Sequence, residues 1–439
     1  MDKDLFRAGS RAKSDCSVTY ERNGAPLTAT VSSSVGSLFG KAIAAAALRV
    51  AAEFGVEAGS FTIDDDGALD GTVAARAEAS LRLAGFARIP GVAPAQAPAA
   101  ARPANARAAS PRGRPRRARL YLPGDQPHLA VNAGLFGADC LVFDLEDAVV
   151  AERKFETRIL VRRVLEENLM LGNCEIAVRV NPLSGPWGKD DLAEIVKARP
   201  HAIVLPKCEF AADVEVADRE ISVLEEAVGI PAGIIHLMLL IETAAGALNA
   251  KEIAAASSRN VALLFGHEDF SRDIKAVPIA RSGAAVAAIG GRTVDRADGA
   301  SAQKTQAASL ADFGIAAIPG AESLLARQMI VLAARAAKID PLDSTYADVG
   351  NEEGLRASCE EARALGFAGK GVLHPAQIPI VMKAFRPTEE EALRAEKIVA
   401  AFDAAAAEGR GAISVDGAMV DAPVAEKARG ILRDYRGTL

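Results

Sequence analysis

The sequence predicts an α/β fold in which a closed eight-stranded parallel barrel follows a small α+β domain. Three observations lead to this prediction. The chain has 439 residues, which is more than one ordinary domain needs. A segment rich in Ala, Pro and Arg interrupts it at residues 91–117. Beyond this segment, short apolar runs alternate with helical stretches, which is typical of parallel strands joined by crossover helices.

Residues 1–90 predict the small α+β domain. Alternating runs predict strands and 3.6-residue periodicity predicts helices, in the order strand 16–21, strand 26–34, helix 35–55, strand 60–65 and helix 72–85. Gly55 ends the first helix and Asp66-Gly67 marks a turn. The apolar positions of the first helix that we expect to face a core are Leu38, Ile43, Ala46, Val50 and Phe54.

Residues 91–117 predict a linker. The segment has no repeating apolar face, and its prolines favour a semi-extended tether. The segment ends in an arginine run, which we expect to be solvated, formed by Arg112, Arg114, Arg116 and Arg117. No aromatic residues are interleaved with them for base stacking, so the run does not predict nucleic-acid binding.

Residues 118–385 predict the barrel. Each of its first six strands is expected in one apolar run: RLYLP, CLVFDLE, EIAVRVN, AIVLPK, HLMLLIE and VALLFGHED. The seventh strand is open between IAAIPG and the stretch near DSTYADV, and the eighth is expected in GKGVLHP. The Ala/Gly-rich residues 281–320 are expected to form an insertion or a long excursion.

Composition excludes several classes of protein. The net charge of −6 gives no general attraction to nucleic acid or anionic lipid. The N-terminus lacks the apolar core of a signal peptide, and no later run is apolar enough to span a membrane, so we expect a cytoplasmic protein with no membrane partner. The five scattered cysteines include no CxxC pair and are expected to be reduced core thiols.

Conspicuous polar groups follow the six clear strands. Carboxyl ends of parallel barrel strands open on one face, so these groups are expected to converge despite their wide separation in sequence. They are Pro123, Gly124, Asp144, Glu146, Asp147, Arg179, Asn181, Lys207, Glu242, Glu268 and Asp269.

Among these groups, Glu242 and Asp269 predict a Mg²⁺ site, because this ion binds one or two protein carboxylates and fills its remaining positions with water and substrate. The alternative is that each carboxylate only caps the next helix.

Arg179 could bind a substrate carboxylate through two parallel hydrogen bonds. An internal ion pair with Glu146 or Asp147 is the alternative for this arginine.

The motifs resemble the citrate lyase beta-subunit family. The run RARLYLPGDQPHLAVNAGLFGADCLVFDLEDAVV is followed by VRVNPL, VLPK, LLIETAAGAL, LFGHEDF, LGFAGKGVLHPAQI and GAISVDGAMVDAPV. This resemblance implies a TIM barrel with a C-terminal lid at residues 386–439, assembled as homotrimers or hexamers. It also implies Mg²⁺ on Glu242 and Asp269, the keto-acid carboxylate on Arg179, and a thioester substrate.

Residues 1–90 resemble the acyl carrier (gamma) subunit of citrate lyase through FRAGSRAKSDCSV, SSSVGSLFGKAI and DDDGALDGTVAARAEA. The resemblance implies that Ser14 carries a phosphoribosyl-dephospho-CoA arm, and an alpha-type transferase subunit is then an expected partner. The plain alternative is that Ser14 is an ordinary serine of a flexible terminus.

Two departures from the family pattern affect the expected reaction. Where the family reads LGFDGK, with an aspartate expected to act from the lid, this chain has Ala368. The second departure is the insertion-like segment 281–320. Glu353, Glu268 or an ordered water are the candidate substitutes for the missing carboxylate.

We therefore expect a Mg²⁺-dependent carbon–carbon lyase that converts a citryl thioester to oxaloacetate and an acetyl thioester. In this hypothesis Glu146, Asp147 and Lys207 assist catalysis, and backbone donors near Pro123-Gly124 face the thioester oxygen. One alternative is a lyase for free malyl-CoA or citramalyl-CoA with a vestigial carrier domain. The other is a catalytically silent scaffold of a lyase complex.

Overall fold

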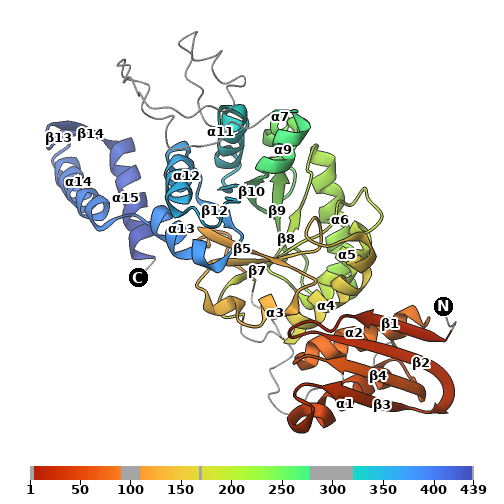
Figure 1. Cartoon of the computed structure of the whole chain (residues 1–439). Coiled ribbons are helices and arrows are strands. Elements are labelled where there is room, and N and C mark those ends of the chain that lie inside the picture. Colours follow the sequence, from red (N-terminus) through yellow and green to blue (C-terminus); the bar gives the residue numbers. More distant parts are fainter. Residues whose placement is uncertain (1–3, 90–108, 168–170, 277–319, 438–439) are drawn as a thin grey trace, which may run out of the picture.

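The computed structural model describes residues 4–89, 109–167, 171–276 and 320–437. Its centre is a closed parallel barrel with the strand order β10-β11-β12-β5-β6-β7-β8-β9 (Figure 1). The strands are β5 (Ala118–Pro123), β6 (Cys140–Asp144), β7 (Glu175–Arg179), β8 (Ala202–Leu205), β9 (His236–Ile241), β10 (Asn260–Phe265), β11 (Asp340–Asp343) and β12 (Gly369–Val372). The predicted TIM barrel is thereby confirmed.

Seven of the expected barrel strands lie where the sequence placed them. Strand β11 is the seventh in the barrel and ends at Asp343, so the stretch near DSTYADV was the better of the two alternatives. The competing run IAAIPG and the segment 281–320 fall almost wholly outside the described residues. Because the strands are covered on both faces, their inward and outward side chains are both apolar, and this explains the continuous apolar runs.

Helices surround the barrel and fill the connections between its strands (Figure 1). They are α3 (Pro127–Ala130), α4 (Lys154–Glu167), α5 (Gly188–Ile195), α6 (Ala211–Ala227), α7 (Ala244–Leu248), α8 (Ala250–Ala255), α9 (His267–Asp273), α11 (Ala321–Ala336), α12 (Glu352–Leu365) and α13 (Ile378–Phe385). No helix in the described part of the chain is long and apolar enough to cross a membrane.

The N-terminal domain is a four-stranded sheet of order β1-β2-β4-β3 with two helices. Its elements are β1 (Leu5–Gly9), β2 (Cys16–Pro26), β3 (Thr28–Ser33), α1 (Gly36–Glu53), β4 (Ala58–Asp65) and α2 (Asp70–Leu83). The sequence did not predict β1, which pairs antiparallel with β2 at the edge of the sheet. The core prediction for α1 was wrong at Leu38, whose side chain is 80% exposed, and right for Ile43, Ala46, Val50 and Phe54.

The prediction that the arginine run of the linker is solvated holds for Arg112, which is exposed, and was wrong for Arg116. Arg116 is 1% exposed and its Nε lies 2.6 Å from Glu175 at the amino end of β7. Arg112 donates to the carbonyl oxygens of Ser258 and Asn260. These guanidinium groups satisfy acceptors at the amino ends of strands, so residues 109–117 are part of the barrel floor rather than a free tether.

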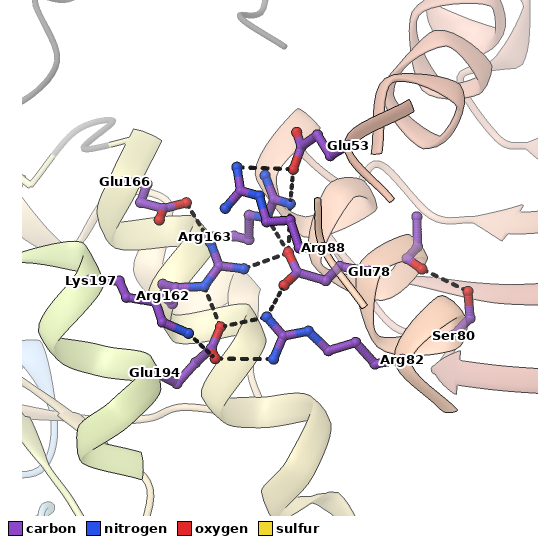
Figure 2. A network of polar contacts seen from close by, with 11 residues as sticks. Glu53, Glu78, Ser80, Arg82, Arg88, Arg162, Arg163, Glu166, Glu194 and Lys197 are labelled. Carbon is purple, nitrogen blue, oxygen red and sulfur yellow. Dashed lines mark hydrogen bonds and ion pairs between the residues drawn. The ribbon is translucent and has the colours of Figure 1, made fainter. Parts of the chain in front are cut away.

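Helix α2 of the N-terminal domain packs against α4 of the barrel (Figure 1). Figure 2 shows the buried ion network at this contact. Glu78 of α2 lies 2.5 Å from Arg162 and accepts a 2.7 Å bond from Arg163, both of α4. Glu194 of α5 pairs in turn with Arg162 at 2.5 Å and with Arg82 of α2 at 3.0 Å. The two domains therefore share a charged interface at which Glu78 and Arg162 are fully buried.

The C-terminal extension is formed by α14 (Glu389–Ala407), β13 (Ala412–Val415), β14 (Ala418–Asp421) and α15 (Ala422–Arg436). It has small apolar clusters of its own and projects away from the barrel (Figure 1). A lid role for this extension stays a prediction.

Candidate active site

A cavity of about 440 Å³ opens at the carboxyl ends of the barrel strands. Its lining includes most of the polar residues that the sequence predicted to converge, together with residues that follow β11 and β12. The lining residues are Arg119, Tyr121, Pro123, Asp144, Asp147, Ala148, Arg179, Leu240, Glu242, Phe265, Gly266, His267, Glu268, Asp269, Ser344, Thr345 and Leu373.

Glu242 follows β9 and is 2% exposed. Its Oε1 accepts a 2.9 Å hydrogen bond from the backbone N–H of Lys207. Lys207 adopts the left-handed conformation with φ of 51°, which a non-glycine residue rarely takes, and this turn directs the N–H at the carboxylate. Gly266 also makes room, because a Cβ there would lie 2.7 Å from Glu242. The carboxylate is therefore held in place by the backbones of two neighbouring strand ends.

Asp269 lies in the first turn of α9, directly after β10, and faces the same cavity as Glu242. Its carboxylate also pairs with Arg272 in the next turn of the helix. Burial, reinforced by Glu146 and Asp269, raises the pKa of Glu242 to about 8. A cation between these carboxylates would relieve that repulsion.

Glu146 is buried between two cations. Its Oε1 lies 2.5 Å from Lys207 Nζ, and its Oε2 lies 3.0 Å from Arg179 Nη1. Burial raises the pKa of Glu146 although both cations oppose this. Burial acts to lower the pKa of Lys207, but the bond to Glu146 outweighs it and the pKa is raised. Asp147 lies farther out, 53% exposed and 3.5 Å from Arg179.

The guanidinium of Arg179 binds the carboxylate of Asp144, a partner that the sequence did not single out. Arg179 Nε and Nη2 donate to the two Asp144 oxygens at 2.8 and 2.6 Å. Asp144 also accepts the backbone N–H groups of Glu146 and Ala148. The internal ion-pair alternative is thus present in the structure, and the arginine is fixed over the Tyr121 ring at 5.7 Å.

Two further predicted positions differ from expectation. The N–H of Gly124 donates to the Asp144 carbonyl at 2.9 Å, so the backbone donor expected there for a thioester oxygen is already used within the protein. Ala368 directly precedes β12 and packs against the barrel interior, so the expectation that this position acts from the lid was wrong. Of the two glutamates considered as substitutes for the missing carboxylate, Glu268 lines the cavity and Glu353 lies in the first turn of α12.

Ser14 lies in the turn between β1 and β2, and its N–H donates to the Asp66 carbonyl at 2.9 Å. The neighbouring Asp15 is buried and takes two 3.0 Å bonds from Arg76. Ser14 therefore belongs to a fixed turn, and the premise of a flexible terminus does not hold.

A series of polar contacts connects the turn that contains Ser14 to the end of the barrel where the cavity opens. Gly9 N–H donates to Glu156 in the first turn of α4 at 2.7 Å, and Arg76 lies 3.5 Å from the same carboxylate. Glu156 then pairs with Arg153, which pairs with Asp125 at 2.8 Å. Asp125 follows the carboxyl end of β5, so the contacts lead from the Ser14 turn to the face where the cavity opens.

Sequence reasoning missed Arg119, because it reads as an ordinary residue of the strand RLYLP. A charged residue inside an apolar strand run was the only available signal.

The described residues contain no cluster of three or more His, Cys, Asp and Glu side chains that could hold a metal ion. The pair Glu242 and Asp269 nevertheless fits Mg²⁺, which needs only one or two protein carboxylates. The five cysteines are buried and free, as predicted.

Comparisons with known proteins agree with this architecture. Residues 117–375 match the profile of the HpcH/HpaI aldolase/citrate lyase family, and residues 3–84 match that of the malonate decarboxylase delta subunit. The chain is 35% identical to citrate lyase subunit beta of Leuconostoc mesenteroides subsp. cremoris, over 72% of this chain and 92% of the relative. It is 31% identical to the mitochondrial citramalyl-CoA lyase of Rattus norvegicus, over 72% of this chain and 85% of the relative.

A solved structure with the same fold is protein CitE from Mycobacterium tuberculosis, in complex with magnesium, acetoacetate and coenzyme A. It is 29% identical to this chain with a TM-score of 0.52, and the match covers 74% of this chain and 99% of that one.

Proposed function

Because the chain belongs to the HpcH/HpaI aldolase/citrate lyase family, we propose that it is a Mg²⁺-dependent lyase that cleaves a carbon–carbon bond in a 3-hydroxyacyl thioester. The observation that carries this proposal is the convergence of Glu242, Asp269 and the Arg179 cluster on one cavity at the carboxyl ends of the strands. The related CitE structure contains magnesium and coenzyme A, which supports the same ligands here.

The reaction requires a proton to leave the substrate hydroxyl while the adjacent carbon–carbon bond breaks. The electron pair of that bond passes to the thioester half, whose enolate then takes a proton. Glu242 and Asp269 would hold Mg²⁺, which supplies Lewis-acid polarisation of the hydroxyl and carboxylate oxygens. Arg179 Nη1 points toward the Glu146 and Asp147 side of the cavity, where it would orient the keto-acid half.

The contact between Lys207 and Glu146 determines which charges lie beside Glu242, the proposed metal ligand. Their contact keeps Lys207 protonated, and its backbone N–H holds Glu242 in place. Lys207 would thereby place a positive charge near the thioester half, where negative charge develops in the transition state.

We further propose that the acyl group is carried by the N-terminal domain on a phosphoribosyl-dephospho-CoA arm attached to Ser14. The N-terminal match to an acyl-carrier family and the contacts from the Ser14 turn to Asp125 support this. Attachment in the same chain would keep the thioester at a high effective concentration beside the cavity. With a citryl group the products would be oxaloacetate and an acetyl thioester on the arm.

An arm on Ser14 would also have to be reached by the enzyme that loads it. Leu38 and Phe39, at the start of α1, are 80% and 55% exposed. They lie at the end of the domain where Ser34 bonds Asp66, the residue whose carbonyl accepts from Ser14. This apolar pair would serve as the contact for an alpha-type transferase subunit, within a homotrimeric or hexameric assembly.

The decisive experiment is a side-by-side assay with citryl, malyl and citramalyl thioesters, with and without Mg²⁺. We expect activity that disappears with chelator, and a loss of at least about 1,000-fold in Glu242→Gln, because removing a metal ligand removes its electrostatic stabilisation. Glu426→Gln, on the exposed face of α15, serves as the matched control. Activity that survives chelation would overturn the proposal, and no activity with any thioester would favour a silent scaffold.

The carrier proposal has its own test. Mass spectrometry of protein co-expressed with arm-synthesis enzymes should show added mass on Ser14, and Ser14→Ala should lose it. Absence of added mass, with full activity on free CoA thioesters, would instead support the second candidate, a malyl-CoA or citramalyl-CoA lyase. The similarity to the rat citramalyl-CoA lyase favours that candidate.

A further inference from the structure

Arg119 is a buried cation inside the barrel that the proposed reaction does not use. It is the second residue of β5, is 1% exposed and lines the cavity. Its Nη2 donates to the Asp343 carbonyl oxygen at 2.9 Å. Its Nε and Nη1 are buried and have no hydrogen-bond partner among the described residues.

No acidic side chain in the described part of the chain forms an ion pair with Arg119. The carboxylate of the neighbouring Asp343 is already shared by Arg327 at 3.1 Å and Lys370 at 2.8 Å. A buried charge without a counter-ion costs several kcal/mol, so such a group is rare unless a partner arrives from outside the chain. The unpaired donors of Arg119 therefore indicate an anionic ligand.

The cavity reaches this guanidinium, since Arg119 is among its lining residues. On the neighbouring strand β12, Gly371 lies opposite Arg119, and Thr345 packs over it, because a Cβ at Gly371 would lie 2.7 Å from Thr345. Ser344 and Thr345 line the same cavity and can add hydroxyl donors. Arg119 thus borders a polar part of the cavity.

Arg119 and Arg179 differ in what they can offer a ligand. The fork of Arg179 is taken by Asp144, and its guanidinium lies over Tyr121, two residues after Arg119 on the same strand. Arg119 keeps its Nε and Nη1 donors, which lie on different edges of the guanidinium, and each can give a charge-assisted hydrogen bond to an anionic oxygen.

We propose that Arg119 binds a second carboxylate of the keto-acid half of the substrate. This inference rests on the proposed lyase function and refines its substrate class. A citryl thioester releases oxaloacetate, which has two carboxylates, whereas citramalyl and malyl thioesters release pyruvate and glyoxylate, which have one. Arg119 makes the site selective for the dicarboxylate product and its parent thioester.

Calorimetric titration of oxaloacetate and pyruvate in the presence of Mg²⁺ tests this selectivity directly. The wild type should bind oxaloacetate at least about 10-fold tighter than pyruvate, because a hydrogen bond between charged groups contributes roughly 1.5–3 kcal/mol. Arg119→Met should weaken oxaloacetate by about 10- to 100-fold and leave pyruvate nearly unchanged. Equal weakening of both acids, or of neither, would overturn the inference.

A fold control separates a binding role from a structural one. Arg119→Met removes an unpaired buried charge, so its melting temperature should be equal to or above that of the wild type. Arg327→Met is the matched control: it breaks a paired buried arginine next to Asp343, should lower the melting temperature, and should keep the preference for oxaloacetate.

The outcomes also distinguish this inference from the function on which it rests. If the wild type cleaves thioesters with Mg²⁺ but Arg119→Met retains its preference for citryl over citramalyl thioester, only the role of Arg119 fails. If the wild type neither cleaves a thioester nor binds oxaloacetate, both fail together.

Discussion

The Glu78 carboxylate of the N-terminal domain accepts a 2.7 Å hydrogen bond from Nε of Arg163, a barrel residue 85 positions later in the chain. Glu78 is fully buried, and its neighbours Arg162, Arg163 and Arg82 lower its pKa to about 2 although burial alone would raise it. The contact therefore joins two domains through a carboxylate that stays charged under all ordinary conditions.

Glu78→Ala should separate the two domains. The substitution leaves Arg162 and Arg163 buried without their central partner, and breaking such a network costs about 3–5 kcal/mol. We expect a lower melting temperature and faster proteolysis between the domains. Glu426→Ala, in an exposed ion pair of the C-terminal extension, should change neither. A melting curve that matches the wild type would show that the network does not hold the domains together.

Glu167→Gln should stabilise the protein at high pH only. Glu167, at the end of α4, has its pKa raised to about 7 by burial and by Asp70, against about 4.5 in the unfolded chain. Folding therefore favours the protonated form of Glu167. The stability that this form contributes to the folded protein is fully present below pH 4.5 and is lost as pH rises through 7. At pH 8 the wild type must bury a charge that the glutamine variant lacks.

Thermal unfolding at pH 5 and pH 8 checks this prediction. The variant should melt a few degrees above the wild type at pH 8 and close to it at pH 5. An equal difference at the two pH values would mean that the titration of Glu167 is not its cause.

The barrel was predictable because its strands are buried on both faces and so carry continuous apolar runs. Strand β11 was ambiguous because its four residues, DPLD, include two aspartates and a proline. Strand β1 was missed because LFRAG is a half-exposed edge strand with little apolar pattern.

For the site, the sequence placed polar groups at strand ends but could not say which of them pair. Arg179 was expected to meet a substrate, Glu146 or Asp147, and it does lie 3.0 Å from Glu146. Its Nε and Nη2 also hold Asp144, because strand register brings β6 and β7 side by side with those two residues opposite each other. The buried domain interface was likewise invisible, since its partners lie far apart in the chain and each reads as an ordinary helix-surface charge.

Arg179→Lys should reduce kcat/KM by at least about 100-fold, since a lysine cannot contact both oxygens of Asp144 and also reach Glu146. Steady-state kinetics with the best thioester substrate measures this. Arg158→Lys, which alters a buried ion pair with Asp191 on α5, is the matched control and should retain most of its activity. If both variants lose activity alike, the effect comes from general destabilisation rather than from the site.

Gly266→Ala should weaken Mg²⁺ binding without unfolding the protein. Gly266 has φ of −106°, which any residue can adopt, so the main cost of a side chain is its contact with Glu242, 2.7 Å from the new Cβ, with Leu240 next at 3.3 Å. The carboxylate must move, and displacing a metal ligand through its supporting residue typically costs 10- to 100-fold in metal affinity. The Mg²⁺ concentration for half-maximal activity should rise by that factor. Gly40→Ala, in α1 where a Cβ meets nothing within 4 Å, should leave it unchanged. A Gly266→Ala variant with the Mg²⁺ dependence of the wild type would show that Glu242 does not hold the ion.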